Sequence, residues 1–381
     1  MDFHLTREQE MVRKMYREFA ENEVKPLAEE LDEEERFPME TVEKMGKLGM
    51  MGIYFPKKYG GAGGDVLSYA MCVEELSKVC GTTGVIVSAH TSLCCAPIYE
   101  NGTEEQKRKY LPDLLSGKKI GAFGLTEPNA GTDASGQQTT AVKNENGDYV
   151  LNGSKCFITN GTVAGTIVVF AMTDQKAGNH GISAFIVEST FPGFSVGKKE
   201  KKMGIRGSST CDLIFEDCVV PKENLLGKEG QGFKIAMQTL NTGRLGVAAQ
   251  SIGVAQGCLD EAVKYAKERK QFGRRIGDFQ AISFMIADMA TKLEAAKQLV
   301  YKAAYMMDTK QDATLNASMA KYYASEVCNE IAQKAVQIHG GYGFIKDYKI
   351  ERMFRDCRVF TIYEGTSQVQ QIVIGSKLLK K

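Results

Sequence analysis

Residues 147–160 read GDYVLNGSKCFITN, and this stretch lies between two long helical regions of the sequence. Asn152-Gly153 is a residue pair typical of two-residue hairpin turns, so the stretch predicts two β-strands paired around it. The segments TIVVFAM, ISAFIVE and STCDLIFEDCVVP follow, all rich in Val, Ile and Phe and separated by Gly and Pro. Short strands with no helical stretch between them predict an antiparallel sheet or barrel.

Helical periodicity precedes this β region and returns after it. Residues 6–24 begin with Thr6, a favourable helix N-cap, followed by acidic residues in the first turn and apolar residues at helical spacing. Residues 103–117 repeat the signal, from the cap Thr103 to a terminal glycine. From about residue 232 onward, amphipathic runs follow one another with few breakers, which predicts a helical bundle.

The order of these signals predicts an α+β fold of three domains. We expect an N-terminal α-helical domain over residues 1–119, a barrel-like middle domain with an antiparallel sheet over residues 120–226, and a C-terminal α-helical bundle over residues 227–381. A chain of 381 residues is long enough for two or three packed units that share a large buried core.

Composition argues against several classes of protein. The formal net charge is +1, with 43% hydrophobic and 25% charged residues, so neither nucleic acid nor an anionic membrane is expected as a partner. The first residues are densely charged and lack the apolar segment of a signal peptide, and no run approaches the roughly 18 apolar residues of a membrane span. The ten cysteines form no Cys-x-x-Cys pair, which predicts reduced, buried thiols in a cytoplasmic protein and no metal site.

Two common motifs give no support for a function in this sequence, because one is absent and the other occurs without its companions. No G-x-G-x-x-G follows a predicted strand, which argues against a nicotinamide-binding Rossmann unit. Residues 116–119 and 318–321 match S-x-x-K, but the companion motifs of the enzymes that use it are missing, so we interpret both as chance matches.

Four segments have compositions suited to ligand binding. Residues 121–136 hold four glycines and several hydroxyls, and residues 154–161 put an aromatic ring and a hydroxyl on one strand face. Residues 268–280 combine three arginines with two phenylalanines, and residues 337–344 contain a Gly-Gly pair. Glycine lets backbone N–H groups approach a ligand, and guanidinium groups suit phosphates. Each segment also has a structural interpretation: an interdomain turn, strand packing, a solvated helix end and a glycine C-cap, respectively.

The segment RVFTIYEGTSQVQQIV, residues 358–373, contains one acid, Glu364, which is the last acid of the chain. Apolar residues precede it, and Gly365 and a polar run follow it. Glu364 is therefore either a solvated loop acid or a catalytic base whose pKa is raised by apolar packing.

These segments, together with MGIRGS and TGRLGVAAQ, resemble those of the acyl-CoA dehydrogenase family in their order and spacing, over essentially the whole chain. Within the family the chain is most similar to bacterial short-chain members, the butyryl-CoA dehydrogenases. Its C-terminal third also resembles the 2-enoyl-CoA reductases of anaerobes, including caffeyl-CoA and acrylyl-CoA reductases. The resemblance implies two α domains around a β domain, an FAD cofactor and a homotetramer built as a dimer of dimers.

The resemblance also implies roles for individual residues. Glu364 would be the catalytic base, and the Thr159 hydroxyl would reach flavin N5. The implied FAD-binding residues are Phe123, Leu125, Thr126, Gly131, Thr132, Phe157, Ile158, Thr159, Arg269, Phe272, Gln280, Gln337, Gly340, Gly341, Thr366 and Gln368, several of them from a neighbouring subunit. The implied substrate-binding residues are Thr132, Asn241, Arg244 and Gly365, and residues 88–99 would line the acyl cavity.

Three positions depart from the family pattern. Asn241 stands where the family usually has Asp, and Phe157 where many relatives have Trp. Gly243 stands where some long-chain and branched-chain relatives carry their base, which leaves Glu364 as the candidate.

The implied reaction joins transfer of the α-proton beside a thioester, by Glu364, to transfer of hydride between the β-carbon and flavin N5. Its substrates would be acyl-CoA and enoyl-CoA, and an electron-transferring flavoprotein would be the electron partner. Three alternatives stay open: an aryl- or acrylyl-type enoyl-CoA reductase, an acyl-CoA oxidase, and a flavin- and CoA-binding protein without turnover.

Overall fold

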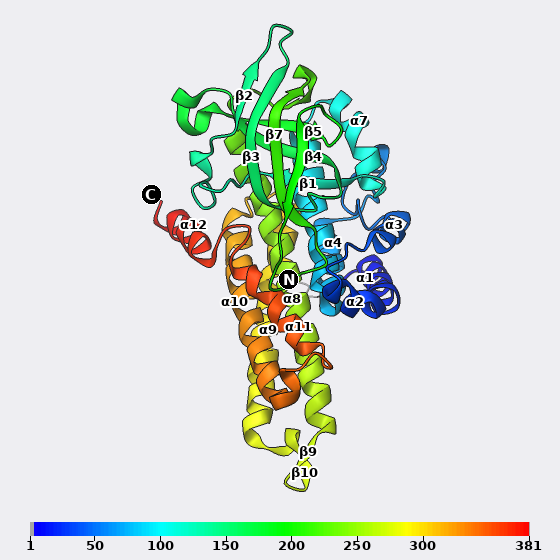
Figure 1. Cartoon of the computed structure of the whole chain (residues 1–381). Coiled ribbons are helices and arrows are strands. Elements are labelled where there is room, and N and C mark those ends of the chain that lie inside the picture. The colour runs from blue at the N-terminus through cyan, green and yellow to red at the C-terminus, as the bar shows by residue number, and fades with distance from the viewer. Residues whose placement is uncertain (1–3, 381) are drawn as a thin grey trace.

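The computed structural model describes residues 4–380. Figure 1 shows the sheet at one end of the molecule, the long C-terminal helices running away from it, and the N-terminal helices packed along one side. The predicted α+β fold, with helical N-terminal and C-terminal domains around a β-sheet, is confirmed. No helix in the described part of the chain is both long enough and apolar enough to span a membrane.

The described N-terminal region holds seven α-helices, and two of them begin directly after the caps that the sequence predicts. They are α1 (Arg7–Phe19), α2 (Ala28–Glu33), α3 (Met39–Lys47), α4 (Val66–Val79), α5 (Gly81–Ala89), α6 (Ala96–Asn101) and α7 (Glu104–Leu115). Thr6 caps α1 in a capping box, because Gln9 N donates to Thr6 Oγ1 and Thr6 N donates to Gln9 Oε1. Thr103 caps α7 in the same way through Gln106.

The middle region is a mixed sheet of eight strands in the order β6-β7-β3-β2-β4-β5-β8, with β1 paired to β4. The strands are β1 (Ile120–Gly124), β2 (Thr140–Lys143), β3 (Tyr149–Thr159), β4 (Ala164–Met172), β5 (Ile182–Glu188), β6 (Phe194–Lys199), β7 (Thr210–Val220) and β8 (Leu225–Leu226). Most neighbours are antiparallel, whereas β1–β4 and β2–β4 are parallel.

The hairpin predicted at Asn152-Gly153 is wrong. β3 runs through both residues as one strand, and the turn that joins it to β2 lies at residues 144–148. Gly153 has φ +142° at an irregularity in the pairing with β7, and a Cβ there would lie 2.6 Å from Thr139 Oγ1. The glycine is therefore required by close packing within a bulged strand and not by a reversal of the chain.

The alternation of side chains predicted for β4 is confirmed, because successive residues of this strand lie in two different core clusters. Val168 and Phe170 face the helices α6 and α7 in one core cluster, while Ile167 and Val169 face β3 and β7 in another. A third cluster joins the N-terminal and C-terminal helices. The sheet thus has two buried faces. All ten cysteines lie in the described residues, are buried and are unpaired.

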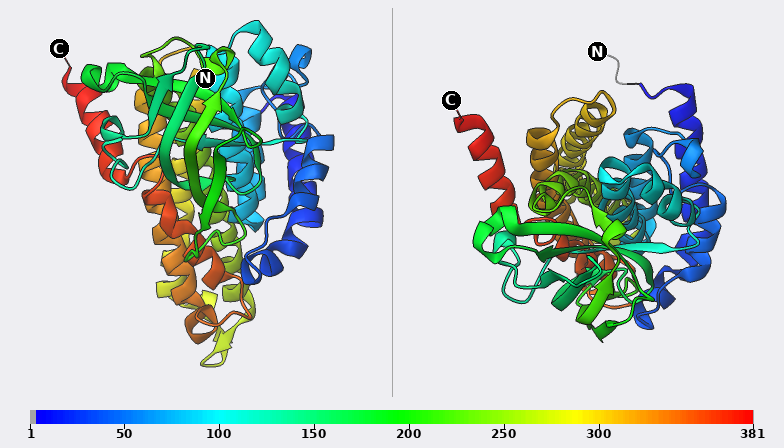
Figure 2. Two further views of the ribbon diagram at one scale, coloured as in Figure 1. Left: turned by 45° about the horizontal axis from the view of Figure 1, so that its top comes forward. Right: turned by 90° about the horizontal axis from the view of Figure 1, so that it is seen from above.

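The C-terminal helices are α8 (Gly232–Glu268), α9 (Gln280–Asp308), α10 (Thr314–His339), α11 (Ile350–Cys357) and α12 (Ser367–Leu379). A short hairpin of β9 (Lys270–Gln271) and β10 (Arg274–Arg275) caps the far end of the bundle. Both views in Figure 2 show α12 standing away from the rest of the bundle at the edge of the molecule.

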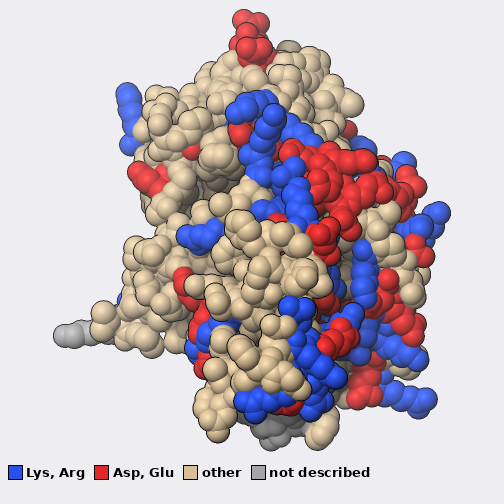
Figure 3. Space-filling model, turned by 60° about the horizontal axis from the view of Figure 1, so that its bottom comes forward, with Lys and Arg blue, Asp and Glu red and all other residues tan. Residues whose placement is uncertain are grey.

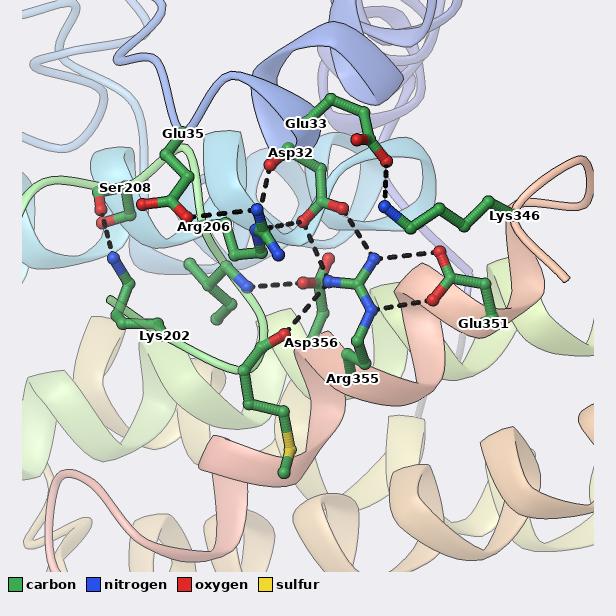
Figure 4. Close-up of polar contacts among 12 residues, drawn as sticks. Asp32, Glu33, Glu35, Lys202, Arg206, Ser208, Lys346, Glu351, Arg355 and Asp356 are labelled. Carbon is green, nitrogen blue, oxygen red and sulfur yellow. Dashed lines mark hydrogen bonds and ion pairs between the residues drawn. The ribbon is translucent and has the colours of Figure 1, made fainter. Parts of the chain in front are cut away.

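An ionic network ties the three regions together (Figure 4). Arg355 of α11 donates to both carboxylate oxygens of Asp32 in α2, at 3.1 and 2.6 Å, and to the Met203 carbonyl oxygen in the β6–β7 connection. Asp356 is buried and accepts a hydrogen bond from Ile205 N at 2.5 Å. Figure 3, which looks toward the lower end of the molecule in Figure 1, shows acidic and basic side chains next to one another on that face.

Candidate active site

Glu364 lies in the short turn between a 3₁₀ segment (Arg358–Thr361) and α12. Its Oε2 atom is shielded from solvent and has no hydrogen-bond partner among the described residues. Burial raises the pKa of Glu364 to about 7, although the nearby cations Arg244 and Lys321 act in the opposite direction. The carboxyl group therefore has the environment expected of a base that works near neutral pH, and the solvated-acid interpretation does not fit it.

Gly243 of α8 makes room for this carboxyl group. A Cβ at position 243 would lie 2.3 Å from Glu364 Oε2 and 2.9 Å from Leu93 Cδ2. Any larger residue would therefore displace the glutamate. Leu93 belongs to the segment 88–99 that the sequence places around the acyl chain, so the structure brings one residue of that segment next to Glu364.

The rest of the segment 88–99 is tightly packed. Cys94, Cys95 and Ala96 are fully or almost fully buried. His90 Nδ1 accepts a hydrogen bond from Gly121 N at 2.9 Å, and burial lowers the pKa of His90 to about 4. Tyr99 packs edge-on against Phe55 and Tyr59. These contacts fix the π-helical turn His90–Cys95 in place.

Arg244, also on α8, is 5% exposed. Its Nη1 donates to Asn241 Oδ1 at 3.1 Å and lies 3.5 Å from Ser318 Oγ, whereas its Nε is buried with no partner among the described residues. Burial lowers the pKa of Arg244, and Glu364 counteracts this effect. The structure thus brings Arg244 and Asn241 together and places Arg244 near Glu364.

The loop after β1 is anchored at its base and open at its tip. Glu127 accepts hydrogen bonds from Gln138 N and Thr139 N, and Lys155 Nζ donates to Glu127 Oε1 at 2.7 Å. Thr126 O accepts from Cys156 N. At the tip, Gly131 and Thr132 are exposed, and a Cβ on Gly131 would meet no atom within 4 Å. Phe123 and Leu125 lie at the start of the loop, in contact with a core cluster.

Phe157 is a strained and exposed aromatic residue. It has φ +58° within the irregular pairing of β3 with β7, and its side chain is 66% exposed. Its neighbour Ile158 is buried, and Thr159 is half-buried. A non-glycine residue in the left-handed region next to a β-bulge is typical of ligand-binding sites.

The remaining predicted cofactor residues lie far from Glu364 in the same chain. Arg269 ends α8, 25 positions after Arg244, which corresponds to about 37 Å along the helix axis. Phe272, in the β9–β10 hairpin, is 94% exposed. Gly340 and Gly341 follow α10 and line a cavity of about 410 Å³ that Arg269 also lines. Gln280 begins α9, and Gln337 lies near the end of α10.

Thr366 and Gln368 lie on the other side of Glu364, at the start of α12. Thr366 caps that helix, since its Oγ1 accepts from Val369 N, and Gln368 is exposed. The structure therefore divides the predicted FAD residues into two groups. One group lies in the sheet, in the loop after β1 and at the start of α12, and the other lies at the far end of the bundle.

Two buried lysines near the site are missing from the sequence-based assignment. Lys155 and Lys321 are both fully buried. Lys321 lies among Ala317, Ala320 and Ala324, small residues that mark an inward-facing stripe of α10, and this spacing was the available signal. For Lys155 the sequence offers none, because a lysine on a strand is ordinarily solvent-facing.

Three family models cover nearly the whole chain. The N-terminal, middle and C-terminal domain models of acyl-CoA dehydrogenases match residues 6–118, 122–218 and 230–379, respectively. The chain is 62% identical over 380 residues to a short-chain specific acyl-CoA dehydrogenase of Clostridium acetobutylicum, with 100% of both chains covered.

Two reductases are also similar to this chain. It is 59% identical to the CarC subunit of the caffeyl-CoA reductase–Etf complex of Acetobacterium woodii, covering 99% of this chain and 100% of the relative. It is 52% identical to an acryloyl-CoA reductase (NADH) of Anaerotignum propionicum, covering 100% and 97%.

Solved structures show the same fold. Butyryl-CoA dehydrogenase from Megasphaera elsdenii has a TM-score of 0.98 at 52% identity, with 100% of both chains covered. An acyl-CoA dehydrogenase from Bacillus anthracis complexed with FAD has a TM-score of 0.93 at 38% identity, covering 98% of this chain and 67% of that one.

Proposed function

Because this chain belongs to the acyl-CoA dehydrogenase family, a family of FAD-dependent oxidoreductases, we propose that it is a short-chain acyl-CoA dehydrogenase or 2-enoyl-CoA reductase whose catalytic base is Glu364. One observation carries the proposal. Glu364 Oε2 is shielded and has no hydrogen-bond partner among the described residues, burial raises the pKa of the carboxyl group, and Arg244 lies beside it.

The residues of the first group fit a flavin. The exposed, strained Phe157 offers an aromatic face, Thr159 offers a hydroxyl, and the open backbone at Gly131 leaves space for a close approach. The second group suits a nucleotide diphosphate, since Arg269 and the Gly340-Gly341 backbone line one cavity. FAD, when bound, would accept hydride from the β-carbon of the substrate or return it.

The two groups lie too far apart in one chain to hold one cofactor, which favours a site shared between protomers. We propose the homotetramer, a dimer of dimers, in which a neighbouring chain supplies the second group. Aromatic side chains exposed in the C-terminal region support this assembly: Phe272 of the β9–β10 hairpin at 94%, Phe344 between α10 and α11 at 87%, and Phe284 of α9 at 65% exposure. The proposed domains are residues 1–119, 120–226 and 227–381.

The chain's own residues account for the proton chemistry. In the oxidative direction, ionised Glu364 removes the α-proton, and its backbone N–H donates to the thioester carbonyl oxygen, where negative charge develops. Gly365 leaves room for the thioester, and Arg244 with Asn241 binds the CoA portion. In the reductive direction, protonated Glu364 returns the α-proton. The similarity to the caffeyl-CoA and acryloyl-CoA reductases favours testing both directions.

We propose that an electron-transferring flavoprotein is the electron partner. Support comes from the relative that is named as a subunit of a reductase–Etf complex, and from the lack of a G-x-G-x-x-G motif after a strand. The purified chain should therefore not oxidise NADH by itself. Rapid NADH oxidation without an added flavoprotein would contradict this part of the proposal.

Glu364→Gln tests the central assignment. The amide keeps the shape of the side chain but cannot accept the α-proton, so flavin bleaching by butyryl-CoA should slow by about 10²–10⁴-fold, while FAD content stays unchanged. Stopped-flow absorbance measures the rate, and Glu364→Asp should retain part of it. If a folded, FAD-loaded Glu364→Gln variant bleaches at the wild-type rate, the base lies elsewhere.

A further inference from the structure

Lys321 is a buried cation beneath the turn that carries Glu364. It belongs to α10, is 0% exposed, and its Nζ donates to the Gly365 carbonyl oxygen at 2.7 Å. Within the described residues it forms no ion pair with a carboxylate within 4 Å. An isolated buried ammonium is costly, so its retention beside Glu364 calls for an explanation.

The turn itself needs support. Glu364 has φ +53° and Gly365 has φ +87°, so two consecutive residues occupy the left-handed region, which is strained for a non-glycine residue such as Glu364. Gln370 Nε2 donates to the carbonyl oxygens of both residues, at 3.1 and 2.9 Å. Lys321 from α10 and Gln370 from α12 therefore both donate to the Gly365 carbonyl oxygen, and Gln370 also donates to that of Glu364.

Charged and titratable groups from each packed element face this turn. Arg244 projects from α8, Lys321 and Glu326 from α10, Tyr69 from α4, and Tyr363 from the turn itself. Burial lowers the pKa of Lys321 to about 8, Glu364 and Glu326 favour its charged form, and Arg244 disfavours it. Near neutral pH the lysine is thus mainly an ammonium, and its attraction for Glu364 is mutual.

We propose that Lys321 is a positioning residue for the base. Its ammonium group fixes the Gly365 carbonyl so that the Glu364 carboxyl faces Gly243 and Arg244, and its charge keeps part of Glu364 ionised in an environment that otherwise favours the neutral acid. This inference rests on the proposed role of Glu364. It gives S-M-A-K, residues 318–321, a role different from the nucleophile chemistry of S-x-x-K enzymes.

The test separates the hydrogen bond from the charge. Lys321→Met removes both, Lys321→Gln removes the charge but keeps an N–H donor, and Gln370→Leu removes a donor without changing charge. Lys14→Met is the matched control, because Lys14 is exposed on α1 and pairs only loosely with Glu18, at 3.8 Å. Each variant is purified as the FAD-loaded protein.

The main readout is the titration midpoint of the Glu364 carboxyl group, followed by its infrared carboxylic-acid band without substrate and identified by the loss of that band in Glu364→Gln. We expect both Lys321 variants to raise the midpoint by about one unit, because an opposite charge nearby lowers a carboxyl pKa by at least that much. Lys14→Met and Gln370→Leu should leave it unchanged.

Flavin bleaching against pH is the second readout. The bleaching rate on the alkaline plateau should be lowest in Lys321→Met and higher in Lys321→Gln. Gln370→Leu should lower the plateau rate without moving the pH midpoint of the profile. An unshifted midpoint in either folded Lys321 variant overturns the inference while leaving the proposed function intact. Wild-type bleaching in Glu364→Gln overturns the proposed function itself, so the two failures are distinguishable.

Discussion

Lys155→Met would remove the ammonium group that anchors the loop after β1. Lys155 Nζ donates to Glu127 Oε1 at 2.7 Å, to Leu125 O at 3.2 Å and to Gln137 Oε1 at 3.2 Å, and the side chain is 0% exposed. Methionine fills similar space but donates no hydrogen bond. The variant therefore leaves three acceptors without this donor, one of them a carboxylate, in the loop that carries Thr126 and Thr132.

The expected loss of stability follows from the burial of this pair. Removing one member of a buried ion pair costs about 3–5 kcal/mol, and the lower end applies because Glu127 keeps its hydrogen bonds from Gln138 N and Thr139 N. Burial lowers the pKa of Lys155 to about 8, so the cost of burying the ammonium is only partly recovered in the folded protein. Replacing both partners should accordingly be far less harmful than replacing one.

The loss should depend on pH. Burial tends to raise the pKa of Glu127, but Lys155 and the backbone donors outweigh it, so the folded-state pKa lies below the ordinary value. The stability this contributes is present above the unfolded pKa and lost as the pH falls through the folded one. Without Lys155 the Glu127 pKa rises, so the difference between variant and wild type should be largest at neutral pH and shrink toward pH 4.

Thermal melting of the FAD-loaded protein measures the effect, with an expected fall of roughly 4–6 °C in Tm for a chain of this length and weaker retention of FAD. Lys143→Met is the control, because Lys143 is an exposed lysine in the same sheet that pairs with Glu229. Lys155→Met/Glu127→Gln should recover most of the lost stability. If Lys155→Met melts like the wild type, or the double variant is no more stable than the single one, the reasoning is refuted.

Three further outcomes follow from the structure. Because the pKa of Glu364 is raised to about 7, its ionised fraction and the rate of flavin bleaching should rise about tenfold from pH 6 to pH 8, and a flat stopped-flow profile would contradict this. Gly243→Ala should slow bleaching at least about tenfold with FAD retained, because its Cβ would lie 2.3 Å from Glu364 Oε2, whereas Gly375→Ala, which meets no atom within 4 Å, should not. Burial raises the pKa of Asp356 to about 6, so ionisation of this group should lower the free energy of unfolding as the pH rises from about 4 to 6. Asp356→Asn can still accept the hydrogen bond from Ile205 N, and it should remove this pH dependence from urea-unfolding curves.

Local signals in the sequence account for the order of helices and strands, because capping depends on neighbours close in sequence. Thr6 and Thr103 identify two helix starts from three-residue spacings alone. The hairpin prediction at Asn152-Gly153 is wrong for the opposite reason. Glycine is needed there because any side chain would collide with Thr139, which lies in a neighbouring part of the sheet. A tertiary contact of this kind has no local signature.

The residues of the candidate site could also be predicted from the sequence only in part. Glu364 stood out as a single acid after an apolar approach, and the structure gives it the shielding that a base needs. Lys321 and Lys155 did not stand out, since the direction of a lysine side chain is decided by which elements pack over it. The division of the predicted FAD residues between two ends of the molecule also depends on the length of α8, which spacing in the sequence does not reveal.

The length of α8 has a thermodynamic consequence. With Arg244 and Arg269 about 37 Å apart on one straight element, each protomer in the proposed assembly contributes one part to each of two cofactor sites. Association of protomers and uptake of FAD are then linked equilibria, so each shifts the other by mass action. Dilution would release cofactor from an otherwise folded chain, and added FAD would draw dilute protomers together.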